Sequence, residues 1–149
     1  MQIPSTISIW LSEQAGPLII IGCLIAFIMV VLFLSARNRS ASMNEKRAGS
    51  NEYTFVNYLS AYGFDANIAR ITYQYLQEKQ NVSFPIEASD SLDEDLGLGS
   101  GDIAESVADL LALTERESQP GMMHTPLITV EDLVRYLQAS PRKAEIAAA

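Results

Sequence analysis

Residues 17–36 read PLIIIGCLIAFIMVVLFLSA, a run of 20 residues without a charged side chain. At about 1.5 Å per residue, a helix of this length measures about 30 Å, the thickness of the hydrocarbon core of a bilayer. The run has no polar face, and a core helix of a soluble domain has one. No Lys or Arg precedes it, and Leu34 stands where a cleavable signal peptide needs a small residue. The sequence therefore predicts an uncleaved transmembrane helix over residues 17–36.

The charges on either side of this span predict its orientation. Residues 1–16 contain no Lys or Arg, whereas Arg37, Arg39, Lys46 and Arg47 follow the span. Because cationic flanks stay on the cytoplasmic side, we expect a single-pass protein of the cell inner membrane. Its short N-terminal tail would be extracytoplasmic and its C-terminal domain cytoplasmic.

The composition of the chain argues against several classes of function. The 149 residues include 10 Lys and Arg against 18 Asp and Glu, which gives a formal net charge of −8. A nucleic-acid-binding protein needs clustered cations, so nucleic acid is not an expected partner. One Cys and one His exclude a disulfide framework, and no metal site is expected. No nucleophile–base–acid set is visible, so we expect no catalytic residues and no enzyme activity.

A linker and an all-α domain are predicted after the span. Residues 37–52 are polar, lack apolar periodicity and are typical of a flexible linker whose cations can rest on anionic headgroups. Residues 53–140 show helical rather than strand periodicity and predict a small helical bundle. Residues 141–149 are expected to form a frayed tail.

Four amphipathic helices are expected in this bundle, with room for one further turn before the last. Gly63 is placed to end the first helix in the left-handed conformation, and Asp65 can cap the second. A long loop over residues 81–99 precedes the third, and Thr129-x-x-Asp132 has the pattern of a capping box at the start of the last. The apolar stripes of the four helices are, in order, Phe55, Leu59 and Tyr62; Ile68, Ile71, Tyr75 and Leu76; Ile103, Val107, Leu110 and Leu111; and Val130, Leu133, Val134 and Leu137.

Acidic residues are concentrated in the second half of the chain. Ten acidic side chains and one basic side chain lie from Glu87 to Glu117, a run that ordinarily forms a solvated face. Three of them, Asp102, Glu105 and Asp109, lie opposite the apolar stripe of the third helix and are predicted to form an acidic ridge. Such a ridge suits a partner with a cationic surface.

Ser100 stands between two glycines, Gly99 and Gly101, at the start of the third helix. Two roles are open for its hydroxyl. It can cap the helix by accepting a hydrogen bond from a free backbone N–H, in competition with Asp102. It can instead remain exposed at a loop-to-helix junction and be open to covalent modification.

The stretch SLDEDLGLGSGDIAESV, residues 91–107, resembles the motif of acyl carrier proteins. In that family an Asp-Leu-Gly-(apolar)-Asp-Ser-Leu run opens the second helix. Residues 95–98 match its first part, and Ser100 falls on the serine that receives phosphopantetheine. Gly99 and Gly101 stand where the family has Asp and Leu. The stretch ITVEDLVRYL, residues 128–137, is similar to the final helix of the family, and the resemblance covers residues 65–139.

This resemblance implies an acyl-carrier-like bundle of four to five helices and a function as a membrane-tethered carrier. Ser100 would hold covalent phosphopantetheine and present an acyl or aminoacyl thioester to membrane-bound transferases. The implied partners are the bilayer, a phosphopantetheinyl transferase and a membrane-bound acyltransferase or other membrane complex, contacted through Asp102, Glu105 and Asp109. The alternative is an unmodified carrier-like domain that acts as a membrane-anchored adaptor or assembly subunit.

Overall fold

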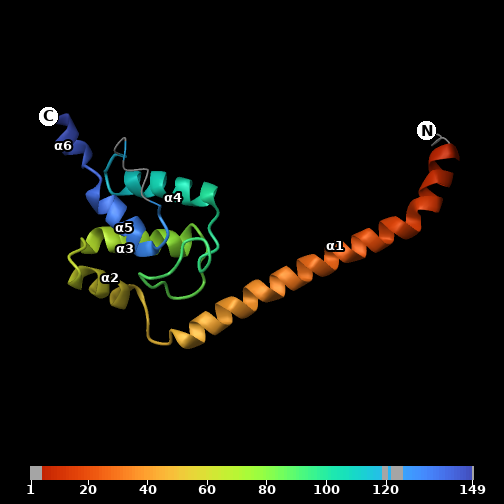
Figure 1. Ribbon diagram of the computed structural model, residues 1–149, viewed down its shortest axis with the longest axis horizontal. Helices are drawn as coiled ribbons and strands as arrows, with labels where there is room; N and C mark the ends of the chain where they lie inside the picture. The colour runs from red at the N-terminus through yellow and green to blue at the C-terminus, as the bar shows by residue number, and fades with distance from the viewer. Residues whose placement is uncertain (1–4, 119–120, 122–125, 149) are drawn as a thin grey trace. The chain divides into compact units, whose positions relative to one another are not determined.

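Figure 1 shows the computed structural model of the chain, which describes residues 5–118, 121 and 126–148. Within these residues every regular element is a helix, so the predicted all-α class is confirmed. The chain divides into two compact units, Met1–Ser42 and Met43–Ala149. The hydrophobic core of the described residues lies in the second unit.

Helix α1 (Ser5–Lys46) contains the apolar run that the sequence singled out. Its segment Ala15–Ser35 is long and apolar enough to cross a membrane, and none of that segment is buried inside the protein. Large apolar side chains along this segment are exposed; Ile20 and Phe33, for example, are each 67% exposed. The length and composition of this helix are therefore those of a single membrane-spanning segment.

The helix does not end where the apolar run ends. Helix α1 continues through Lys46, whereas the sequence predicted an irregular linker over residues 37–52. A helix that is already nucleated extends at little cost through Ala, Met, Glu, Lys and Arg, which all favour helix. The end of the predicted linker is also held in place, by Arg47.

Arg47 joins the start of the second unit to its long loop. Its Nη1 and Nη2 donate to the two carboxylate oxygens of Asp90 at 2.7 and 2.6 Å. Its Nη1 also donates to the carbonyl oxygen of Pro85 at 2.7 Å, and its guanidinium lies 5.5 Å from the ring centroid of Phe84. The side chains of Arg47 and Asp90 are 11% and 3% exposed. They form a bidentate, buried ion pair, the kind that requires good geometry to be favourable.

Helix α2 (Glu52–Ala61) opens the bundle. Phe55 and Leu59 are buried as predicted, but Tyr62 is 68% exposed because it follows the last helical residue and turns away from the core. Gly63 adopts a φ of 86°, which confirms the predicted left-handed end of the helix.

Helix α3 (Ala66–Glu78) is the centre of the bundle. Its predicted cap is confirmed, since the Asp65 carboxylate accepts a hydrogen bond from the backbone N–H of Asn67 at 2.7 Å. The helix packs against α2 and also against two later helices, α4 (Ser100–Leu113) and α5 (Val130–Ala139). In Figure 1, α2 and α4 lie on opposite sides of α3.

Helix α5 follows the predicted pattern, whereas the tail after it does not. The capping box at the start of α5 is present, with the Thr129 hydroxyl accepting from the backbone N–H of Asp132 at 3.2 Å. A short helix, α6 (Lys143–Ala147), lies in the tail that was expected to fray. Of the four predicted apolar stripes, Tyr62 alone is exposed and Ile71 and Ile103 are half-buried, while the other residues are buried.

The long loop between α3 and α4 is ordered although it contains no helix or strand. Its side chains alternate, so that Val82, Phe84, Ile86 and Ala88 enter the core. Side chains from other segments satisfy its backbone, as when Gln77 Nε2 donates to the carbonyl oxygen of Phe84 at 2.7 Å. The loop ends at the start of α4, where Ser100 lies.

Candidate functional site

Ser100 is the first residue of α4, and its side chain is exposed. Gly99 is the N-cap residue, and the Asp102 carboxylate reaches back to accept a hydrogen bond from the Gly99 N–H at 2.9 Å. No described residue forms a hydrogen bond with the Ser100 hydroxyl. The helix is therefore capped by Gly99 and Asp102, and the hydroxyl of Ser100 is not needed to hold the fold.

The two glycines beside Ser100 are not required by the backbone. Neither Gly99 nor Gly101 has a positive φ. A Cβ added at Gly101 would meet nothing within 4 Å, and one added at Gly99 would meet only an Asp102 carboxylate oxygen at 3.4 Å. A larger side chain therefore fits at both positions.

A pocket of about 290 Å³ opens next to Ser100, and apolar side chains from two parts of the chain form most of its walls. Tyr136 of α5 adds a phenol whose oxygen is 2.9 Å from the Ser118 hydroxyl oxygen. The sequence predicted the apolar stripe of α4, but it did not predict that Tyr136 would line this pocket. The lining residues are Ser100, Ile103, Ala104, Val107, Pro126, Leu127 and Tyr136.

The three acidic residues of the predicted ridge do not share one environment. Asp102 and Glu105 are exposed on the first turns of α4, close in sequence to Ser100. Asp109 is half-buried and accepts a hydrogen bond from the Tyr75 hydroxyl at 2.8 Å, with Lys79 Nζ at 4.0 Å. Two of the three carboxylates therefore lie on the exposed surface, and the third takes part in the contact between α3 and α4.

The setting of Asp109 also changes the acidity of its partner. Burial raises the pKa of the Tyr75 hydroxyl, and the hydrogen bond to Asp109 raises it further. The phenol therefore stays protonated near neutral pH and remains a donor to the carboxylate. A hollow of about 580 Å³ beside this pair separates the exposed edges of α3 and α4.

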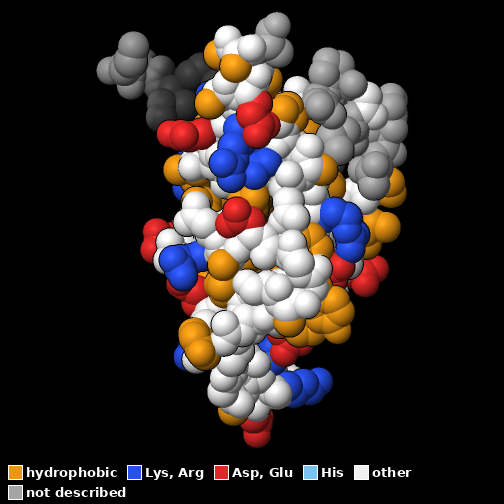
Figure 2. Space-filling view, turned by 90° about the vertical axis from the view of Figure 1, so that its left-hand side faces the viewer, with side chains coloured by type: hydrophobic (Ala, Val, Ile, Leu, Met, Phe, Trp, Pro, Cys, Tyr) orange, Lys and Arg blue, Asp and Glu red, His pale blue; other side chains and the backbone are white. Residues whose placement is uncertain are grey.

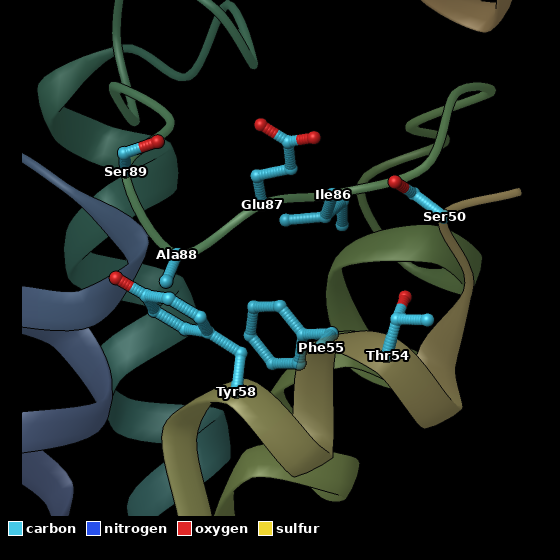
Figure 3. Close-up of a pocket in the computed structure, with 8 residues that line it drawn as sticks. All are labelled: Ser50, Thr54, Phe55, Tyr58, Ile86, Glu87, Ala88 and Ser89. Carbon is cyan, nitrogen blue, oxygen red and sulfur yellow. The ribbon is translucent and has the colours of Figure 1, made fainter. Parts of the chain in front are cut away.

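A further pocket, of about 270 Å³, lies between α2 and the long loop. Figure 3 shows Phe55 and Tyr58 of α2 facing the segment from Ile86 to Ser89, with the Glu87 carboxylate turned away from both rings. Neither His nor Cys lines this pocket. The polar groups in its lining are the hydroxyls of Ser50, Thr54, Tyr58 and Ser89 and the carboxylate of Glu87.

The chemistry that the described residues can perform is limited. Among them, no three His, Cys, Asp or Glu side chains are grouped to hold a metal ion. Among the residues that the structure describes, no basic side chain is hydrogen-bonded to the Ser100 hydroxyl. His124 lies outside the described residues. The arrangement leaves the Ser100 hydroxyl exposed at the start of α4.

Comparisons of the chain with protein-family models, with characterised proteins and with solved structures found no match.

Proposed function

We propose that the chain is a membrane-tethered carrier that holds an acyl or aminoacyl group on phosphopantetheine attached to Ser100. The observation that carries this proposal is the Ser100 hydroxyl at the start of α4, which is exposed and forms no hydrogen bond with the residues that the structure describes. Ser100 is the first residue of the helix and not its N-cap, since Gly99 holds that position and the Asp102 carboxylate accepts from the Gly99 N–H. The resemblance of residues 65–139 to acyl carrier proteins supplies the identity of the group.

The surroundings of Ser100 support this role. An apolar pocket beside the attachment point would shelter part of a carried chain from water. Asp102 and Glu105 leave two exposed negative charges within two turns of the helix, where a loading or accepting enzyme with a basic surface would dock. The chain would itself catalyse nothing, because the thioester is already electrophilic and each transfer belongs to the partner enzyme.

The anchor sets where the carrier works. We infer that α1 crosses the inner membrane once with its N-terminus outside, since Arg37, Arg39 and Lys46 follow the apolar segment and residues 1–16 carry no cation. Tethering would raise the local concentration of the carrier at membrane-bound transferases, with no gain in contact area needed.

The test is the intact mass of the full chain, purified in detergent after co-expression with a broad-specificity phosphopantetheinyl transferase. We expect a mass gain of one phosphopantetheine, and no gain for Ser100→Ala. A second variant, Gly99→Asp with Gly101→Leu, restores the residues of the carrier motif at positions where a side chain fits. We expect it to be modified faster than the natural chain.

The outcomes separate the two functions weighed from the sequence. If neither the natural chain nor the restored variant gains mass, the carrier proposal fails and a membrane-anchored adaptor becomes the better reading. If only the restored variant is modified, the two glycines exclude the transferase, and the natural chain is again an adaptor. Modification that persists in Ser100→Ala would place the attachment site elsewhere.

A further inference from the structure

Helix α2 and the residue that follows it expose a surface without charge. Residues 53–64 contain no charged side chain, in a chain of which 19% of the residues are charged. Tyr53, Tyr58 and Tyr62 are 73, 50 and 68% exposed. The exposed side chains of this segment, which we call the α2 face, are Tyr53, Thr54, Asn57, Tyr58, Ser60, Ala61 and Tyr62.

The tyrosines border this face on both sides. The buried side of α2 is marked by Phe55, Val56 and Leu59, so the helical period places small, uncharged side chains at the centre of the exposed side. On one edge the rings of Tyr58 and Tyr62 contact each other, with centroids 4.9 Å apart. Tyr53 lies on the other edge.

Cations neutralise two of the carboxylates that border the α2 face. Glu52, at the start of the helix, lies 3.5 Å from Arg70 Nε. Glu131 of α5 pairs with Arg135. On the face of the molecule drawn in Figure 2, acidic and basic side chains likewise lie next to one another, with hydrophobic and uncharged atoms between them.

The opposite side of the bundle has a different charge. Asp102 and Glu105 of α4 are exposed, and neither forms an ion pair with another described residue. Since α3 lies between α2 and α4 (Figure 1), the bundle has a neutral, tyrosine-rich side and an acidic side. An anionic membrane surface would repel the acidic side and accept the neutral one.

Few residues separate the α2 face from the apolar segment of α1 along the sequence. The helix continues from Ser35 to Lys46, which adds about 16 Å at 1.5 Å per residue, and residues 47–51 then lead into α2. Helix α2 is therefore the first element of the bundle after the tether. At the high effective concentration that a short tether imposes, a weak preference for the interface is enough.

We propose that the α2 face docks on the headgroup layer of the membrane that α1 spans. Tyrosine is suited to this layer, because its ring enters the apolar boundary while its hydroxyl bonds to headgroups or water. Docking through α2 directs α4 and Ser100 away from the bilayer, toward partners in the aqueous phase. This inference depends on α1 being membrane-inserted and does not depend on the modification of Ser100.

The experiment measures how close each side of the bundle comes to lipid headgroups. The full chain, with Cys23→Ser as background, is placed in nanodiscs of phosphatidylglycerol and phosphatidylethanolamine. A nitroxide is attached either at Asn57→Cys, in the middle of the α2 face, or at Ala108→Cys, on the exposed side of α4. Collisions with a nickel chelate carried on a lipid headgroup are then recorded for each label.

We expect severalfold more collisions at position 57 than at position 108. Replacing Tyr53, Tyr58 and Tyr62 together by Ser should abolish the difference, because the aromatic contacts with the interface are lost. The matched control is Leu113→Ser, which removes a 57% exposed apolar side chain from α4 and should change nothing. Circular dichroism of each variant checks that the helices are retained.

Three results would overturn the proposal. Equal collision rates at the two positions would show that the bundle has no preferred side toward the membrane. A difference that survives in the triple tyrosine variant would show that the α2 face does not cause it. A label at position 57 that is shielded from both lipid-borne and water-soluble nickel would mean that a protein surface covers this face. Because none of these readouts involves Ser100, failure here leaves the carrier proposal standing, and the reverse also holds.

Discussion

At the scale of single residues, the Arg47–Asp90 pair makes the clearest energetic prediction. The two side chains are 11% and 3% exposed, so removing either charge leaves the other buried without its partner. We expect Arg47→Ala to lower the free energy of unfolding by about 3–5 kcal/mol, and Asp90→Asn to act in the same direction. Urea unfolding of the full chain in detergent, followed by circular dichroism, measures both.

The matched control for this prediction is the exposed pair Glu52–Arg70, whose side chains are 37% and 53% exposed. Arg70→Ala should cost at most about 1 kcal/mol, because water screens an exposed pair. Equal losses in the free energy of unfolding for Arg47→Ala and Arg70→Ala would contradict the description of Arg47–Asp90 as a buried ion pair.

The lowered pKa of the Asp132 carboxyl predicts how the stability of the fold depends on pH. Burial would raise the pKa of its carboxyl, but hydrogen bonds from the Thr129 and Ile128 backbone and the charge of Arg135 outweigh burial and hold the pKa below its ordinary value of 3.8. The ionised carboxylate therefore stabilises the fold at neutral pH. That contribution is lost below about pH 4, as the pH falls through the folded-state pKa.

We expect Asp132→Asn to reduce the steepness of acid unfolding below about pH 4 as well as the stability at pH 7. The matched control is Asp93→Asn, which removes one carboxylate from an exposed side chain. The measurement is the urea midpoint at a series of pH values. A slope that is the same in Asp132→Asn and in the natural chain would show that this carboxylate does not drive the pH dependence.

Local sequence patterns predicted the helix caps but not the contacts between residues that are far apart in the sequence. Asp65 and Thr129 were found from local patterns, since a cap and its helix are neighbours in sequence. The contacts Arg47–Asp90 and Tyr75–Asp109 join residues 43 and 34 positions apart, and no local spacing marks them. Asp109 was therefore placed on the open ridge, and Arg47 in a flexible linker.

At the scale of elements, two glycines near the start of α4 should respond oppositely to the same change. Gly101 lies in the first turn with negative φ, whereas Gly97, in the loop before it, has a φ of 75°. A Cβ has open space at both, so only backbone conformation distinguishes them. We expect Gly101→Ala to stabilise by about 0.5 kcal/mol and Gly97→Ala to destabilise by about 1 kcal/mol.

Thermal unfolding of the two variants, compared with the natural chain, decides this prediction. Both changes remove the same entropy from the unfolded chain, so a difference between them reports on the folded state alone. If Gly101→Ala lowered stability, the start of α4 would be more crowded than its geometry indicates.

Helices with strong periodicity were predictable from the sequence, and the irregular connections were not. Val130, Leu133, Val134 and Leu137 repeat at the spacing of a helix, and all are buried in α5. The loop over residues 81–99 was predicted to be irregular, and it is. Its order comes from donors elsewhere, such as Gln77 and Arg47, which local periodicity does not reveal.

At the scale of the whole molecule, the sequence located both the apolar helix that is long enough to cross a membrane and the helical bundle, but it placed the junction between them differently. A polar segment without periodicity was interpreted as a linker, because composition alone does not show where its side chains bind. In the structure the second unit begins at Met43, within the last turns of α1. Met43 packs against the core and Arg47 is buried against Asp90.

The position of this junction predicts how the chain can be divided. A fragment of residues 43–149 keeps the hydrophobic core and the Arg47–Asp90 ion pair, so we expect it to fold without the apolar part of α1 and to unfold cooperatively. A fragment of residues 51–149 looks equally reasonable from the sequence, but it leaves Asp90 buried without its cation. We expect it to be about 3–5 kcal/mol less stable in urea. Arg47→Ala in the longer fragment should reproduce most of this loss, which assigns it to one side chain rather than to the missing length. If the two fragments unfolded at the same urea concentration, the bundle would begin at α2, and the end of α1 would be the simple tether that its composition predicted.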